Sequence, residues 1–175
     1  MTSDQDTLVS DKALLYRKWV LAVLFISLVL IDQISKLQIV AKLNPGERIA
    51  VIPGLFDLTL TYNPGAAFGI LAGLPATTRH IVLGVTTVLA LALVFYFMLR
   101  DYRNDSVAKF ALVMILAGAA GNIIDRVRLG VVIDFLDFYV GSWHWPAFNV
   151  ADSAICVGVA ILLLRTPLRV KSATE

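Results

Sequence analysis

The chain has 175 residues, of which 58% are hydrophobic and only 16% are charged, against about 25% charged residues in ordinary soluble domains. A mean hydropathy of +0.79 indicates more apolar surface than a soluble core of this size can bury, so we interpret the chain as an integral membrane protein. The net charge is only +2, and no basic cluster is interleaved with aromatic residues, which argues against a nucleic-acid partner.

The first apolar segment runs from Trp19 to Ile31 and continues with polar interruptions to about Val40. Its basic flank at residues 17–18 and its length are typical of a secretory signal peptide, but no small-residue cleavage site follows. We therefore predict an uncleaved first transmembrane helix.

Two charged residues lie near the end of this first segment. Asp32 and Lys36 are four residues apart, with the acid nearer the N-terminus, a spacing that favours an ion pair on one helical face. Polar groups inside a membrane are costly and usually face the interior of a bundle. The pair either only stabilises the first helix or supports a nearby site, and the spacing does not decide between the two.

The segment LFDLTLTY at residues 55–62 alternates polar and apolar residues, with Asp57, Thr59 and Thr61 on one side and Leu58, Leu60 and Tyr62 on the other. That period of two predicts a half-buried strand. Turn residues flank it, Pro53-Gly54 before it and Asn63-Pro64-Gly65 after it. We expect a small sheet on the outer membrane surface.

The second and third apolar segments are Ile81–Leu99, which is 19 residues without a charge, and Phe110–Ile124. The third continues into GAAGNIIDR, where Gly118, Asn122, Asp125 and Arg126 fall on one helical face. The small residues at 118–121 predict a close approach by another helix. Because Asp125 and Arg126 are adjacent, we expect each to meet a partner elsewhere. Taken alone, the motif also fits helix packing with an interfacial charge.

The segment after the third helix is rich in aromatic residues and carries an unusual aspartate. Asp134 follows three apolar residues in GVVIDFLDF, where a plain loop aspartate is the simplest interpretation. The aromatic residues that follow predict an interfacial belt, with a water-exposed interfacial histidine among them: Tyr139, Trp143, His144, Trp145 and Phe148.

The fourth apolar segment runs from Val150 to Leu164 and begins with polar residues. Asn149, Asp152 and Ser153 fit the first turn of a helix, and Asp152 can serve there simply as an N-cap or as a first-turn acid that suits the helix dipole. The single cysteine, Cys156, cannot form an intrachain disulfide, and we expect it to be a small buried packing residue. No Cys/His cluster suggests a metal site.

The basic residues divide between the two sides of the membrane. Nine fall in the tails and in the connection between the second and third spans, which we predict to be cytoplasmic: Lys12, Arg17, Lys18, Arg100, Arg103, Lys109, Arg165, Arg169 and Lys171. The other six lie on the outer side near acidic residues: Lys36, Lys42, Arg48, Arg79, Arg126 and Arg128. Both termini are then cytoplasmic, and Asp134 and Asp152 lie at the outer face.

Two carboxylates on the same side of the membrane suggest acid–base chemistry. Paired carboxyls cannot both ionise easily, so they share a proton. The ionised member can take a proton from water while the protonated member donates to a carbonyl oxygen, which hydrolyses an amide without serine, cysteine or metal. Ser153 and Cys156 have no histidine at a suggestive spacing, although spacing alone does not exclude a distant partner.

The chain resembles the lipoprotein signal peptidases, or signal peptidases II, of bacteria, from about Trp19 to Arg165. Five short motifs carry the resemblance, in this order: DQISK at 32–36, NPGAAFG at 63–69, GAAGNIIDR at 118–126, VVIDF at 131–135 and FNVADSAI at 148–155. Each motif is weak alone, but all five in order between four apolar segments are specific.

The resemblance implies an all-α membrane protein of four transmembrane helices with a small β-sheet cradle on the outer surface. The implied activity is that of an aspartic endopeptidase of the bacterial inner membrane, which removes the signal peptide just before a diacylglyceryl-modified cysteine, without a cofactor. It places the catalytic pair at Asp134 and Asp152. The supporting or substrate-binding positions fall on Asp32, Lys36, Asn63, Gly118, Asn122, Arg126, Asn149 and Ala151.

The same resemblance implies one peptidase domain at 17–167, with its outer β region at about 41–75, between cytoplasmic tails at 1–16 and 168–175. Its partners are lipidated prolipoproteins and membrane lipid, and the protein is expected to act as a monomer. Gly65, Ala66 and Ala67 would leave room for a large ligand beside Asn63.

Two other functions stay open at this level. A small proton-coupled transporter or channel would use intramembrane Asp, Arg and Asn residues as a relay. That function predicts polar groups throughout the membrane depth, whereas here they cluster at one side. A non-enzymatic assembly factor would use the small-residue helices to bind partner spans, but it leaves the two aspartates unexplained.

Overall fold

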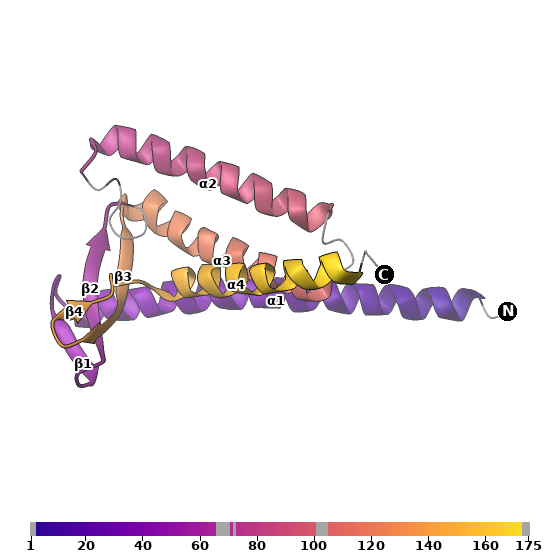
Figure 1. The fold of residues 1–175 in the computed structure, drawn as a ribbon, viewed down its shortest axis with the longest axis horizontal. Coiled ribbons are helices and arrows are strands. Elements are labelled where there is room, and N and C mark those ends of the chain that lie inside the picture. The colour runs from indigo at the N-terminus through magenta and orange to yellow at the C-terminus, as the bar shows by residue number, and fades with distance from the viewer. Residues whose placement is uncertain (1–2, 66–70, 72, 101–104, 173–175) are drawn as a thin grey trace.

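The structure is a computed structural model that describes residues 3–65, 71, 73–100 and 105–172. Four helices are topped at one end by a small antiparallel sheet (Figure 1). In chain order the elements are α1 (Ser3–Lys42), β1 (Arg48–Ile52), β2 (Phe56–Asn63), α2 (Ala76–Leu99), α3 (Ser106–Leu129), β3 (Val132–Val140), β4 (Trp143–His144) and α4 (Val150–Ser172).

All four predicted apolar segments form helices, and each helix extends beyond the predicted segment. Three stretches of helix are long and apolar enough to cross a membrane: Lys18–Lys42, Ala76–Phe97 and Ser106–Leu129. Among the described residues, α4 does not meet the same measure of length and hydropathy. A mostly helical membrane protein is therefore confirmed, with three of the four predicted spans identified.

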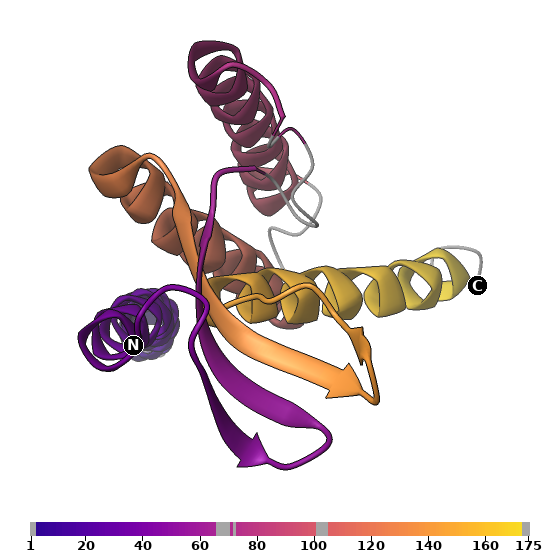
Figure 2. The same ribbon diagram turned by 90° about the vertical axis from the view of Figure 1, so that its left-hand side faces the viewer.

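The packing of α3 against α4 depends on glycine. A side chain on Gly118 would overlap the carbonyl oxygen of Ala151, and one on Gly158 would lie 2.6 Å from the carbonyl oxygen of Ala111. The two helix backbones therefore lie in direct contact, as the small residues in GAAGN predict. Figure 2, viewed from the sheet side, shows that the axes of α2 and α4 point in different directions from α3.

The sheet has the strand order β1-β2-β3-β4, and every neighbouring pair is antiparallel. The predicted strand at 55–62 corresponds to β2. The predicted regular alternation of buried and exposed residues along β2 is wrong in detail, because the pairing of β2 with β3 shifts in register between Leu58 and Thr61. Asp57 and Thr59 are consequently buried, while Thr61 and Tyr62 are exposed.

An apolar core joins the sheet to the end of α1. Ile39 of α1 and Leu43, which directly follows that helix, pack with Leu60 of β2 and with Ile133 and Phe135 of β3. Because Ile133 and Phe135 flank Asp134 in sequence, this packing fixes the segment of β3 that carries the aspartate. The sheet lies at the opposite end of the bundle from the N-terminal end of α1 and the C-terminal end of α4 (Figure 1).

Candidate active site

Asp134 is buried in β3, where two side-chain amides hold its carboxyl group. Asn63 donates a hydrogen bond of 3.0 Å to its Oδ2, and Asn149 donates one of 2.7 Å to its Oδ1. Burial raises the pKa of Asp134 to about 7, against the opposing effect of the Asn63 hydrogen bond; the nearby Asp152 carboxylate raises that pKa further. The loop aspartate considered from sequence is thus a buried strand residue that titrates near neutrality.

Asp152 lies in the first turn of α4 and exchanges hydrogen bonds with Asn149. The Asn149 Oδ1 accepts from the backbone N–H of Asp152 at 2.9 Å, and the Asp152 Oδ2 accepts from the backbone N–H of Asn149 at 3.3 Å. This reciprocal pair is a capping box with Asn and Asp in place of the more frequent residues. Because Asn149 also donates to Asp134, one asparagine links the two carboxyl groups.

A second amide orients Asp152 from α3. Asn122 donates from Nδ2 to the Asp152 Oδ1 at 2.8 Å. Its own Oδ1 accepts from Lys36 Nζ and from Asn149 Nδ2, each at 3.2 Å. A lysine ammonium only donates, so it must face the oxygen of the amide, and the nitrogen of Asn122 must then face Asp152.

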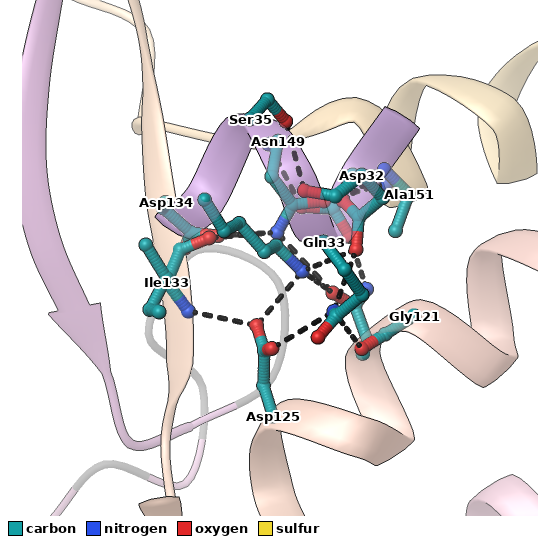
Figure 3. Close-up of polar contacts among 12 residues, drawn as sticks. Asp32, Gln33, Ser35, Gly121, Asp125, Ile133, Asp134, Asn149 and Ala151 are labelled. Carbon is teal, nitrogen blue, oxygen red and sulfur yellow. Dashed lines mark hydrogen bonds and ion pairs between the residues drawn. The ribbon is translucent and has the colours of Figure 1, made fainter. Parts of the chain in front are cut away.

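A buried ionic cluster adjoins these amides, and Figure 3 shows its members Asp32 and Asp125. Lys36, whose side chain is 1% exposed, pairs with Asp32 and with Asp125 at 2.8 Å each. The predicted Asp32–Lys36 pair is therefore confirmed, as is the expectation that Asp125 meets a partner outside its own helix. The Asp32 Oδ1 also accepts from the backbone N–H of Ala151 at 2.9 Å, which ties the start of α4 to α1.

Sequence reasoning did not single out Gln33. Its Nε2 lies 3.0 Å from the Asp125 Oδ1, 3.1 Å from the Asp32 Oδ2 and 3.1 Å from the carbonyl oxygen of Gly121 (Figure 3). The only signal was its position between Asp32 and Lys36 in DQISK. Asp125 also accepts from the backbone N–H of Ile133 at 3.2 Å, so the cluster connects α1, α3 and β3.

Both aspartates line one cavity of about 460 Å³. Arg126 lines the same cavity and donates from Nη2 to the carbonyl oxygen of Gly65 at 3.3 Å. Ala66 and Ala67, expected to leave room for a ligand, lie outside the described residues. Residues 145–148, before α4, also line the cavity, which the sequence did not indicate. Among the described residues, the lining is Asn63, Asn122, Arg126, Val132, Asp134, Trp145, Pro146, Ala147, Phe148, Asp152, Ser153, Ile155 and Cys156.

The structure tests two predictions about His144 and Cys156. The side chain of His144 is 33% exposed, in line with the predicted water-exposed histidine, and its Nδ1 also lies 2.9 Å from the Asp137 Oδ1, a carboxylate that pairs with Arg48 as well. The prediction that Cys156 is buried is wrong: it is exposed and lines the cavity, on a side of α4 turned away from α3. The contacts of His144 in the described structure thus hold it to Asp137 on the sheet.

Comparison with known proteins gives a consistent assignment. A family model described as signal peptidase II matches residues 24–168. The lipoprotein signal peptidase of Geobacter sulfurreducens is 50% identical over 141 residues, which cover 81% of this chain and 86% of that protein. The enzyme of the same name from Neisseria meningitidis is 42% identical over 161 residues, covering 91% and 93%.

Solved structures agree with these relatives. Two bacterial membrane enzymes whose structures were determined by the in meso method, at 2.3 and 1.9 Å resolution, match with TM-scores of 0.76 and 0.74. They are 32% and 31% identical to this chain, and the matches cover 89% and 84% of it and 92% of each solved chain.

Proposed function

The chain belongs to the signal peptidase II family, and from this premise we propose that Asp134 and Asp152 are the catalytic pair of an aspartic endopeptidase. The enzyme removes the signal peptide of a diacylglyceryl-modified bacterial prolipoprotein, cutting just before the lipidated cysteine. The observation that carries the proposal is that the two carboxyl groups line one cavity and are linked through Asn149.

The proposed reaction needs one proton shared between the two carboxyls. Ionised Asp152 takes a proton from a water molecule, whose oxygen attacks the scissile carbonyl carbon, while protonated Asp134 donates to the carbonyl oxygen. The tetrahedral intermediate collapses when the proton held by Asp152 passes to the leaving amide nitrogen and Asp134 recovers its own. The C–N bond breaks, and one water is consumed for each peptide cut.

The assignment of the two roles follows from their surroundings. A pKa of about 7 leaves Asp134 largely protonated on the acidic side of neutrality. Asp152 lies in the first turn of α4, where the helix dipole favours a negative charge relative to the strand position of Asp134. Lys36 orients the amide of Asn122, whose Nδ2 donates a hydrogen bond to the Asp152 carboxylate and so favours its ionised form.

The surrounding residues divide into two proposed groups. Asn63 and Arg126 line the cavity, so we assign them to substrate binding. The remaining predicted residues position the two aspartates, and of these Asn122 also lines the cavity. They act through the ion pairs, amide contacts and close helix packing described above: Asp32, Lys36, Gly118, Asn122, Asn149 and Ala151.

The proposed setting is the bacterial cytoplasmic membrane. We assign the cytoplasmic side to the bundle end far from the sheet, where the N-terminal end of α1 and the C-terminal end of α4 lie (Figure 1). An excess of basic residues in these parts of the chain, including Lys18, Arg100 and Arg165, supports this orientation. With α4 as a fourth span, residues 17–167 form a single peptidase unit, acting as a monomer, whose cavity opens at the outer face.

The arrangement favours a peptidase over the two alternatives. A transporter relay would need polar groups along the membrane depth, but Asp32, Lys36, Asn122 and Asp125 lie together with the dyad at the sheet end. The binding of partner spans by an assembly factor does not require the buried carboxyl of Asp134 to be linked through Asn149 to that of Asp152. Neither function accounts for the shared cavity.

The test uses the purified full chain in detergent or lipid and one precursor in two forms, with and without the diacylglyceryl group. We expect wild type to cleave only the lipidated form, and Asp134→Asn and Asp152→Asn each to lose nearly all turnover while keeping the fold, because the amide cannot exchange the proton. Asp105→Asn, the same change at the N-cap of α3 far from the cavity, is the matched control. Cleavage by the Asp134→Asn, Asp152→Asn double variant would show that another group does the chemistry.

A further inference from the structure

One side of α4 is exposed and leads directly away from the cavity. Cys156, Val159 and Leu163 follow Asp152 at four, seven and eleven residues, a spacing that keeps all four on one side of a helix. Cys156 is exposed, Val159 is 41% exposed and Leu163 is 68% exposed. We call Cys156, Val159 and Leu163 the α4 stripe.

The stripe is continuous with the cavity. Ser153, Ile155 and Cys156 line the space that contains the two aspartates, so the stripe begins inside the cavity and runs toward the opposite end of the bundle. The opposite side of α4 is occupied, because Gly158 packs against Ala111 and Ile115 of α3. Within the described part of the chain, α4 therefore presents an uncharged surface that ends at a carboxyl.

The length of the stripe fits a particular partner. From Asp152 to Leu163 is eleven residues, or about 16 Å at a rise of about 1.5 Å per residue. The apolar region of a secretory signal peptide has about 7–15 residues. Such a segment, as a helix, has a comparable length, and the cleavage site follows its C-terminal end.

We propose that the apolar segment of the substrate's signal peptide docks as a helix along the α4 stripe, with the scissile bond at the Asp152 end; this rests on the proposed function. The small side chain of Cys156 lets the two helices approach closely at the mouth of the cavity, where van der Waals packing is the main source of helix association in lipid. The absence of charge on Val159 and Leu163 suits a partner that is apolar until the cleavage site.

The single native cysteine makes a direct test possible. The lipidated precursor receives one cysteine in its apolar segment, its modified cysteine being blocked by the lipid, and is bound to the Asp134→Asn full-length enzyme, which retains it uncut. Copper–phenanthroline oxidation should then give an enzyme–precursor disulfide through Cys156. In a Cys156→Ser background, Val159→Cys and Leu163→Cys should cross-link to precursor cysteines progressively farther from the cleavage site.

The matched controls lie on another exposed side of the same helix. Val157→Cys and Leu164→Cys, at native positions that are 48% and 73% exposed, should give little cross-linking in the same background. Equal cross-linking at these two positions, or none at the stripe, would overturn the inference. Enzyme–enzyme disulfides at Cys156 in place of precursor disulfides would also overturn it, in favour of a second copy of the chain on this surface.

Cleavage by wild type in parallel separates the two proposals. If lipidated precursor is cut but the stripe does not cross-link, only the docking inference fails. If wild type does not cut it, the proposed function fails. As a second readout, Val159→Trp should raise KM several-fold with kcat nearly unchanged, whereas Val157→Trp should leave both unchanged.

Discussion

Asn122 donates a hydrogen bond of 2.8 Å to Asp152 while the other end of its amide is held by a lysine. Lys36 is thus connected to the proposed catalytic base through a single side chain, although it lies on α1 and the base lies on α4. The same ammonium balances Asp32 and Asp125. One buried cation therefore contributes to the charge of the bundle interior and also sets the orientation of an amide in the candidate site.

Replacing Lys36 with methionine should destabilise the protein. Lys36→Met keeps the length of the side chain but leaves Asp32 and Asp125 buried without a counter-ion, and breaking a buried pair in this way costs about 3–5 kcal/mol. Thermal unfolding in detergent measures the loss. Lys36→Met combined with Asp125→Asn removes one uncompensated charge and should recover part of the midpoint. A Lys36→Met protein as stable as wild type would show that the ion pairs are dispensable.

Adding one methyl group at Gly118 should move the active site. The new Cβ would overlap the carbonyl oxygen of Ala151 and lie 2.7 Å from Ile155, so the first turn of α4 must shift and carry Asp152 with it. Overpacking costs about 1–3 kcal/mol, and a displacement of about 1 Å in catalytic geometry costs roughly 100-fold in rate. We expect Gly118→Ala to lower both kcat and the thermal midpoint.

Gly84→Ala on α2 is the matched control for this change. Nothing lies within 4 Å of a Cβ at Gly84, and alanine in a helix interior is more favourable than glycine by about 0.5–1 kcal/mol. Its kcat should equal that of wild type and its midpoint should not fall. Equal effects of the two substitutions would contradict the tight α3–α4 contact.

Arg126→Ala should reduce activity more than stability. The guanidinium lies close enough to both dyad carboxylates to interact electrostatically with them, and it also holds the carbonyl oxygen of Gly65. Its loss removes a cation from the proposed substrate-binding cavity, so we expect kcat/KM for the lipidated precursor to fall more than tenfold, about 1.4 kcal/mol or more. Arg128→Ala, at an exposed position two residues away, should retain the wild-type value.

The sequence was informative where motifs carry polar residues into apolar surroundings. All ten residues named from the resemblance lie in or against the cluster around the cavity, although they come from distant parts of the chain. Asp152 shows why single motifs mislead: it is a first-turn acid that accepts from the backbone N–H of Asn149, in line with the simplest interpretation, and it lines the cavity as well. The catalytic assignment needs the second carboxyl, which only the fold brings to the same place.

The sequence was less informative for β3 and for the cavity wall. Residues 132–135 are all buried, so the first half of β3 has no alternation of burial that would reveal a strand. Trp145–Phe148 resembles an interfacial aromatic segment in sequence, and its place in the cavity depends on the pairing of Phe148 with Leu136. Cys156 was mispredicted because burial of an apolar helix residue depends on which side meets a neighbour.

The stability of the protein should fall as the pH rises through the range in which Asp134 titrates. Its pKa is about 7 in the folded protein against a reference value of 3.8. Between these values the folded state binds more protons than the unfolded state, so the free energy of unfolding decreases with increasing pH. The contribution is complete below about pH 4 and lost above about pH 7, and it amounts to at most about 4 kcal/mol, because each pKa unit corresponds to about 1.4 kcal/mol.

Comparing variants isolates this contribution from other titrations. From pH 5 to 8.5, the midpoint of wild type should fall relative to that of Asp134→Asn, which has no proton to lose. Asp105→Asn is the control, because the backbone N–H of Ala108 lowers the pKa of Asp105 and its titration is complete below this range. Wild-type activity should decline over the same upper part of the range, since ionisation of Asp134 removes the proton that the carbonyl oxygen receives. Parallel midpoint curves for wild type and Asp134→Asn would mean that Asp134 is already ionised at pH 5, and the roles assigned to the two aspartates would then have to be reversed.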